Sequence, residues 1–161
     1  MLNSKKIYIA SPLGFSESTR SFMDKIDESL TNIGFDVINP WKLAETNEFE
    51  TIKQISDEKE RIQKFKQLNF EIGERNEKAI NESEILLAIL DGVDVDSGTS
   101  AEIGYASAIG KRIIAYRNDF RMAGENEGSL VNIQVEYWIY KSKGEILRDF
   151  DDLLEYLKNI D

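Results

Sequence analysis

Apolar residues along the chain fall into two kinds of segment, which predict strands and helices. Short continuous apolar runs bounded by polar residues or turn signals are typical of buried strands. Longer stretches in which apolar residues recur every three or four positions are typical of helices that pack on one face. Strands are predicted at 6–10, 35–38, 85–90, 112–116 and 137–140. Helices are predicted at 16–33, 57–83, 99–110 and 144–159.

Two glycines and one polar stretch complete this pattern. Gly34 stands where a glycine commonly ends a helix, directly after the segment 16–33. Gly73 lies inside the segment 57–83, where a glycine could bend the helix or divide it in two. Residues 42–56 are polar and lack a clear period, so we expect a loop with some helix there.

Strands that alternate with helices predict an α/β protein with a parallel sheet and right-handed crossovers. Five strands favour a flavodoxin-like, doubly wound sheet of order 2-1-3-4-5, with helices on both faces. In this order the first and third strands flank the switch point, where ligands bind outside the carboxyl ends of the strands. The loops that follow 6–10 and 85–90 should therefore lie side by side. With no repeat or linker visible, we expect one domain over 1–161.

Composition removes several classes of chemistry and of partner. The chain has no cysteine and no histidine, which excludes disulfides, thiolate metal sites, cysteine nucleophiles and Ser-His triads. Acid–base chemistry must then come from Asp, Glu, Tyr, Lys or water. The net charge of -10 would repel a polyanionic backbone, so nucleic-acid polymers are not expected partners. No long apolar run or signal peptide is visible, so we expect no membrane association and a cytoplasmic location.

Carboxylates gather where the buried run 85–90 ends. The sequence from 91 to 106 reads DGVDVDSGTSAEIGYA and carries Asp91, Asp94 and Asp96 before a helix with Glu102. The D-x-x-D-x-D spacing resembles part of a calcium loop, but it lacks the twelve-residue EF-hand pattern and its terminal glutamate. No metal site is therefore predicted. Phosphate loops of the GxxxxGK[ST] and GxGxxG kinds are absent as well.

Two interpretations of Glu102 remain open on the local sequence. Thr99 and Glu102 have the spacing of a capping box, with Thr99 as N-cap and Glu102 reaching back to its N–H. Alternatively, a carboxylate in the first helical turn is stabilised as an anion and could act as a nucleophile. Asp96 suits either a tight Asp-Ser-Gly turn or the acid of a carboxylate pair that cleaves a glycosidic bond. Tyr8, on the first strand, is either a core residue or a side chain that faces these loops.

Four segments resemble the nucleoside 2-deoxyribosyltransferase family, and together they extend over nearly the whole chain. They are K-I-Y-I-A-S-P-L-G-F, N-E-K-A-I-N-E-S-E-I-L-L-A-I-L-D-G, D-S-G-T-S-A-E-I-G-Y-A and K-R-I-I-A-Y. The pattern D-x-G-T-x-x-E-x-G-Y-A in the third segment is the specific part of the resemblance.

The resemblance implies a role for individual residues. Glu102 would be the nucleophile that attacks C1′ of 2-deoxyribose and forms a covalent deoxyribosyl-enzyme. Asp96 would contact and protonate the nucleobase, and Tyr8 would position the nucleophile. A base-contacting aspartate of the family falls on Asn76, a departure that some members share. Asn132 matches a family asparagine that reaches the sugar 5′-hydroxyl across a subunit interface.

The same resemblance implies the remaining substrate contacts and partners. Phe15 should line the base pocket, with Ser11 and Gly98 as further substrate-binding residues. The substrates would be a deoxynucleoside and a free nucleobase, and the reaction needs no metal or organic cofactor. Relatives share residues between subunits, so the resemblance implies a homo-oligomer whose sites are completed by a neighbour.

Three functions remain as hypotheses. The first is transfer of 2-deoxyribose between nucleobases. The second is hydrolysis of deoxynucleoside 5′-monophosphates, in which Ser11, Ser16, Ser18 and Arg20 would bind the phosphate, although the same residues suit a polar loop with a helix cap. The third is a non-catalytic flavodoxin-like binding module. A receiver-type cation site would need an acidic pair after the first strand, which ends Ala10-Ser11-Pro12 instead.

Overall fold

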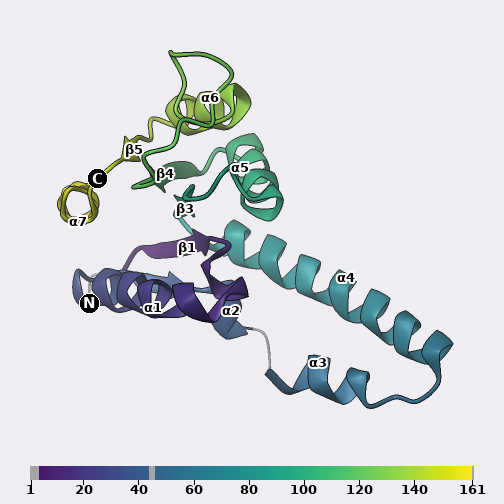
Figure 1. Ribbon diagram of the computed structural model, residues 1–161. Coiled ribbons are helices and arrows are strands. Elements are labelled where there is room, and N and C mark those ends of the chain that lie inside the picture. The colour runs from purple at the N-terminus through teal and green to yellow at the C-terminus, as the bar shows by residue number, and fades with distance from the viewer. Residues whose placement is uncertain (1–3, 44–45, 161) are drawn as a thin grey trace.

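Five parallel strands form the central sheet of the computed structural model, in the order β2-β1-β3-β4-β5 (Figure 1). The structure describes residues 4–43 and 46–160. The strands are β1 (Lys6–Ala10), β2 (Asp36–Ile38), β3 (Ile85–Ile89), β4 (Arg112–Tyr116) and β5 (Ile146–Leu147). This order confirms the predicted flavodoxin-like, doubly wound α/β fold.

Helices cover both faces of the sheet. The helices are η1 (Leu13–Phe15), α1 (Glu17–Asn32), α2 (Pro40–Leu43), α3 (Thr46–Lys53), α4 (Glu58–Glu82), α5 (Ser97–Ala108), α6 (Ile133–Lys141) and α7 (Phe150–Lys158). Residues of α1 and α7 pack on one face, and residues of α4, α5 and α6 pack on the other. Among the described residues, no helix is both long enough and apolar enough to cross a bilayer.

The core follows from strands that are apolar on both faces. Every residue of β3 is buried, as expected for a central strand covered by helices on both sides. Leu86 and Ala88 point toward α4, α5 and α6, whereas Ile85 and Leu87 point toward α1 and α7. Full burial of a side chain such as Leu87 stabilises the fold by roughly 1.5–3 kcal/mol. The central strands therefore fix the edge at which the loops of the candidate site emerge.

The predicted fifth strand is wrong. Residues 137–140 lie inside α6, and β5 is formed by Ile146–Leu147, within the segment predicted as a helix. Asn132 begins α6, since its Oδ1 accepts from the backbone N–H of Gln134 at 3.0 Å. Val135 and Ile139, four residues apart, then bury one helical face. The aromatic and β-branched run favoured a strand by propensity, and tertiary packing overrides that preference.

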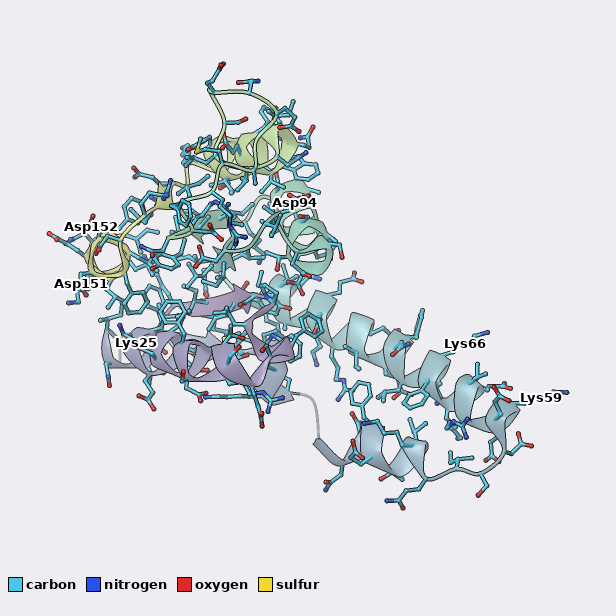
Figure 2. The ribbon with its side chains drawn as sticks, in the orientation of Figure 1. Lys25, Lys59, Lys66, Asp94, Asp151 and Asp152 are labelled. Atoms are coloured by element: carbon cyan, nitrogen blue, oxygen red, sulfur yellow. The ribbon has the colours of Figure 1, made fainter. Side chains whose placement is uncertain are left out.

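The segment 42–56, where a loop with some helix is expected, contains the end of α2 and all of α3. α4 is one continuous helix that Gly73 does not divide. Figure 1 shows α3 and the first half of α4 projecting away from the sheet. Lys59 and Lys66 are exposed on this projecting part of α4 (Figure 2). The second half of α4 packs on the sheet through Ala79 and Ile80. A single helix thus connects the projecting arm to the core.

A capping substitution distinguishes the observed start of the last helix from the predicted start at residue 144. Asp149 is the N-cap of α7 and accepts from the N–H groups of Asp151 and Asp152. Asp149→Ala should lower the free energy of unfolding by about 1 kcal/mol, whereas Asp149→Asn should retain most of the stability. Urea denaturation would measure both. A stabilising effect of Asp149→Ala would instead indicate that residue 149 lies inside a helix, where alanine is preferred.

Candidate active site

The carboxylate of Glu102 lies where β1, α4 and α5 meet. Its Oε1 accepts a hydrogen bond of 2.6 Å from the hydroxyl of Tyr8 on β1. The amide Nδ2 of Asn76 on α4 lies at 3.5 Å from the same oxygen. No donor from the described part of the chain bonds Oε2. One oxygen of the carboxylate is therefore held in place, and the other is left for a ligand.

Burial changes the protonation of this pair. Burial raises the pKa of Glu102 to about 7, the Tyr8 hydrogen bond opposes that rise, and the charge of Asp96 adds to it. Burial, followed by the charge of Glu102, raises the pKa of Tyr8 above its ordinary value. Tyr8 consequently keeps its proton and acts as a donor. The expectation that Glu102 lies in the first turn of the helix is wrong, because α5 begins directly after Asp96, and burial raises the pKa of Glu102.

The capping-box interpretation of Thr99 is also wrong. Asp96, not Thr99, is the N-cap of α5, and its Oδ2 accepts from the Thr99 N–H at 3.0 Å. Thr99 is buried in the first turn, and Glu102 follows in the second turn. A Cβ on Gly98 would lie 3.1 Å from Asp96 Oδ2, tighter than most contacts of this kind. The absence of a side chain at residue 98 leaves room for the Asp96 carboxylate.

A cavity of about 280 Å³ lies in front of Glu102. It brings together Ser11, Phe15, Asn76, Asp96, Gly98 and Glu102, which the sequence had suggested as site residues. Its remaining lining residues are Pro40, Trp41, Phe49, Ile72 and Thr99. Among the residues that the structure describes, two carboxylates and no lysine or arginine line this cavity, which therefore has a negative end and an apolar wall.

The apolar wall contains aromatic residues that sequence reasoning missed. Trp41 packs edge-on against Phe15 with ring centroids 4.5 Å apart, and its Nε1 donates to the Ser11 carbonyl at 2.9 Å. A Cβ on Gly14 would lie 2.0 Å from the Trp41 ring, so only glycine allows this packing. The sequence could have predicted Trp41 as a lining residue, because Trp41 follows the second strand and so lies at the same carboxyl edge as the loop after β1. Phe49 and Ile72 gave no local signal.

Two predicted site residues do not line the cavity. Tyr8 is fully buried behind Glu102 and reaches the site only through its hydroxyl. Asn132 caps α6, and its Nδ2 donates to Glu125 at 2.7 Å. Of the residues suggested for binding a phosphate, Ser11 lines the cavity, whereas Ser16 and Ser18 hydrogen-bond each other and do not line it.

The other aspartates of the loop have structural contacts. Asp91 Oδ1 accepts from two backbone N–H groups beyond β4, those of Asn118 and Asp119. Asp94 is exposed and bonds only the adjacent N–H of Val95. Within residues 4–43 and 46–160, no group of three or more acidic side chains could hold a metal ion.

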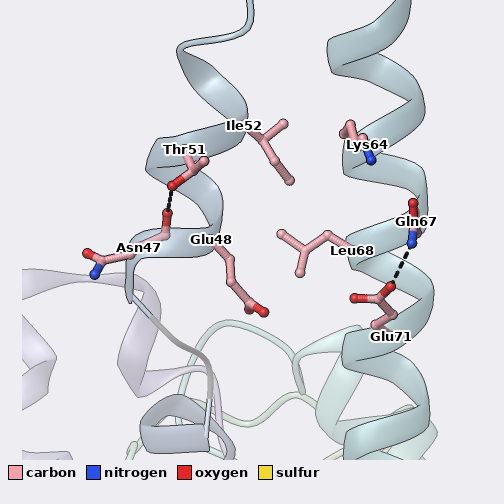
Figure 3. A pocket seen from close by; sticks show the side chains of 8 residues that line it. All are labelled: Asn47, Glu48, Thr51, Ile52, Lys64, Gln67, Leu68 and Glu71. Carbon is pink, nitrogen blue, oxygen red and sulfur yellow. Dashed lines mark hydrogen bonds between the residues drawn. The ribbon is translucent and has the colours of Figure 1, made fainter.

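A larger groove of about 340 Å³ lies between α3 and α4, away from these carboxylates (Figure 3). Polar side chains dominate its lining, and the Glu48–Arg75 ion pair at 3.0 Å links the two helices beside it. It contains none of the predicted site residues. The cavity at Glu102 is the better candidate, because two carboxylates converge there and burial strongly raises the pKa of Glu102, a combination that favours a functional site.

Residues 7–134 match the family model described as nucleoside 2-deoxyribosyltransferase. The chain belongs to the nucleoside 2-deoxyribosyltransferase family. A comparison with curated proteins finds no match. The match contains the whole cavity lining and ends two residues after Asn132.

Solved structures share the fold of this family member at low sequence identity. A conserved protein from Enterococcus faecalis V583 is 24% identical with a TM-score of 0.73, covering 96% of this chain and 98% of that one. A 2-desoxiribosyltransferase from Leishmania mexicana is 18% identical with a TM-score of 0.65, covering 96% and 97%. The CMP N-glycosidase BcmB from Clostridium botulinum is 19% identical with a TM-score of 0.58, covering 95% and 98%. The family includes deoxyribosyltransferases and N-glycosidases.

The raised pKa of Glu102 predicts a pH-dependent stability in this family member. The folded protein binds the Glu102 proton more tightly than the unfolded chain does, so stability falls as pH rises from about 4.5 toward 7. Glu102→Gln removes that penalty and should be more stable than wild type at pH 8, by on the order of 1–3 kcal/mol. The advantage should shrink at pH 4.5. Urea denaturation at both pH values would measure it.

Glu74→Gln is the matched control, because Glu74 is an exposed glutamate on α4. Its effect on the free energy of unfolding should be small at both pH values. If Glu102→Gln and Glu74→Gln show the same pH dependence, burial does not shift the Glu102 carboxyl.

Proposed function

We propose that this protein transfers 2-deoxyribose between nucleobases through a covalent deoxyribosyl-Glu102 intermediate. The observation that carries the proposal is the Glu102 carboxylate in the cavity, with Oε1 held by Tyr8 and Oε2 without a donor in the described part of the chain. A carboxylate of this kind can attack a sugar carbon without histidine, cysteine or a cofactor. Asp96 lines the same cavity and supplies the second carboxyl group.

Two displacements at C1′ account for the transfer. In the first, Oε2 of Glu102 bonds to C1′ while the bond from C1′ to the base nitrogen breaks. The electron pair of that bond stays on the base, which takes a proton from Asp96. In the second, a nitrogen of the incoming base bonds to C1′, the ester to Glu102 breaks, and Asp96 takes up the proton. Two inversions give net retention, and the negative site stabilises each oxocarbenium-like transition state.

Tyr8 and Asn76 hold the nucleophile in this scheme. The Tyr8 hydroxyl stays protonated because burial and the Glu102 charge raise its pKa. It therefore donates to Oε1 both in the free carboxylate and in the ester, where Oε1 becomes the carbonyl oxygen. The Asn76 amide, with a donor and an acceptor, lies beside Oε1 and lines the cavity, where a base edge can reach it.

The cavity lining favours a deoxynucleoside over its 5′-monophosphate. Phe15, Trp41 and Phe49 offer aromatic surface to a nucleobase. A phosphate would meet carboxylates there, and no lysine or arginine among the described lining residues would compensate their charge. The structural similarity to a CMP N-glycosidase keeps hydrolysis of a monophosphate as the second candidate. The substrates tested should therefore include both forms.

Base exchange is the decisive assay. A deoxynucleoside mixed with a different free base should yield the new deoxynucleoside, and chromatography would detect this product. Glu102→Gln should lower the rate by at least about a thousandfold, because it removes the nucleophile. Mass spectrometry of the denatured wild-type protein should show an added deoxyribosyl group when acceptor base is omitted.

Three results would count against the transferase proposal. The first is no exchange across several purine and pyrimidine pairs. The second is faster cleavage of the 5′-monophosphate than of the nucleoside, which supports the hydrolase. The third is near wild-type exchange by Glu102→Gln, which excludes the covalent mechanism.

We further propose a homo-oligomer in which Asn132 completes the site of a neighbouring copy. Ile133, Tyr137 and Tyr140 follow Asn132 at helical spacing on α6 and are 53%, 57% and 50% exposed. An exposed apolar helix face of this kind suits contact with a second copy. Sedimentation should show an oligomer, and Tyr137→Lys should shift it toward monomer with loss of exchange. A monomeric, active wild-type protein would exclude this arrangement.

A further inference from the structure

Arg117, the residue after β4, is a fully buried cation that forms no ion pair within 4 Å among the described residues. Hydrogen bonds from Arg121 lower the pKa of Asp119, and the charge of Arg117 adds a smaller effect. The Arg117 guanidinium donates instead to three backbone carbonyls, those of Leu90, Gly92 at 3.2 Å and Arg121 at 2.7 Å. Its Nε has no hydrogen-bond partner from the described chain. Burying a charge in this way is costly, and an apolar side chain often stabilises such a position better. The guanidinium therefore calls for an explanation beyond stability.

The three carbonyls belong to two loops that lead to predicted site residues. Leu90 and Gly92 lie on the loop from β3 to Asp96, the N-cap of α5. Arg121 lies on the loop from β4 to Asn132, the N-cap of α6. A guanidinium presents its donors in one rigid plane, so a single side chain can fix both loops relative to each other.

Asp91 makes the reciprocal connection. It lies on the first loop, and its Oδ1 accepts from Asn118 N at 2.7 Å and from Asp119 N at 2.8 Å on the second loop. Each loop thus supplies the side chain that satisfies backbone groups of the other. We name this pair of side chains and their hydrogen bonds the Asp91–Arg117 brace. None of these hydrogen bonds involves Asp96.

We propose that the Asp91–Arg117 brace is a positioning device that holds Asp96 in line with the departing base. The proposal rests on the proposed function, in which Asp96 protonates that base. The loop is held by Arg117 at Gly92 and by burial of Val95 next to Asp96. Between these points only two exposed residues, Val93 and Asp94, remain. Small misplacements of a catalytic group cost far more in rate than in substrate binding.

A leaving group that needs no proton separates positioning of the acid from general loss of structure. An N7-methylated purine deoxynucleoside carries a positive charge on its base, which departs as a neutral molecule without protonation. An ordinary purine deoxynucleoside needs the acid. Asp96→Asn keeps an N-cap oxygen but removes the acid, so it should lose about a hundredfold in kcat on the ordinary substrate and little on the methylated one.

The brace variants should reproduce this selective loss. Arg117→Lys keeps the charge but cannot span three carbonyls, and Asp91→Ala frees the second loop from the other side. Both variants should lose at least about tenfold in kcat on the ordinary substrate, with KM nearly unchanged. Their kcat on the methylated substrate should stay within about threefold of the wild-type value. Asp91→Asn, which retains an acceptor oxygen, should recover most of the rate. Asp94→Ala, on the same loop, is the matched control and should match wild type.

Each other outcome overturns the proposal. Equal losses on both substrates by Arg117→Lys and Asp91→Ala would show that the brace only maintains the fold, and wild-type kcat would show that it does not position Asp96. If Arg117→Lys fails to fold, Asp91→Ala decides. If Asp96→Asn loses equally on both substrates, the acid role in the proposed function is wrong and the brace proposal fails with it. If Asp96→Asn is selective and the brace variants are not, only the brace proposal fails.

Discussion

The hydrogen bond from Tyr8 to Glu102 connects the interior of the sheet to the cavity. Tyr8 lies in β1, next to the central strand β3, and its ring belongs to the core beneath α4 and α5. Its hydroxyl lies at the edge of that core and donates a hydrogen bond of 2.6 Å to Glu102 Oε1. The position of the carboxylate is therefore set by the packing of the whole sheet face. The strand order and the helix packing position Tyr8, and its hydrogen bond then affects both the position and the protonation of Glu102.

Much of the fold followed from apolar periodicity, because buried parallel strands read as continuous apolar runs. The count of five strands predicted the sheet order, and the runs that became β1 and β3 placed the site at their carboxyl ends. The fifth strand could not be found in this way. Ile146–Leu147 is too short for a periodic signal, and the aromatic residues of α6 imitate a strand. Helix capping by Asn132 and Asp149 settles the boundaries, and capping depends on geometry that local sequence leaves open.

The sequence likewise predicted some residues of the candidate site and missed others. Glu102 and Asp96 were found because they follow the strongest strand in the chain, and composition left carboxylates as the main reactive groups. Whether Thr99 and Glu102 form a capping box depended on where α5 begins, a difference of three residues between Asp96 and Thr99. Phe49 and Ile72 reach the cavity from α3 and α4, across a long stretch of chain, so no local pattern could place them. Long-range packing, rather than motif, supplies the wall of the site.

The exposure of Phe15 has a thermodynamic consequence for ligand binding. The residue is 73% exposed, and its ring packs edge-on against Trp41 at the wall of the cavity. A nucleobase that stacks there removes apolar surface of both partners from water, which gives binding a negative heat-capacity change. The enthalpy of binding therefore becomes more favourable as temperature rises, while the entropic contribution weakens. Because the fold leaves this aromatic residue exposed, the relative enthalpic and entropic contributions to binding of such a ligand would depend on temperature.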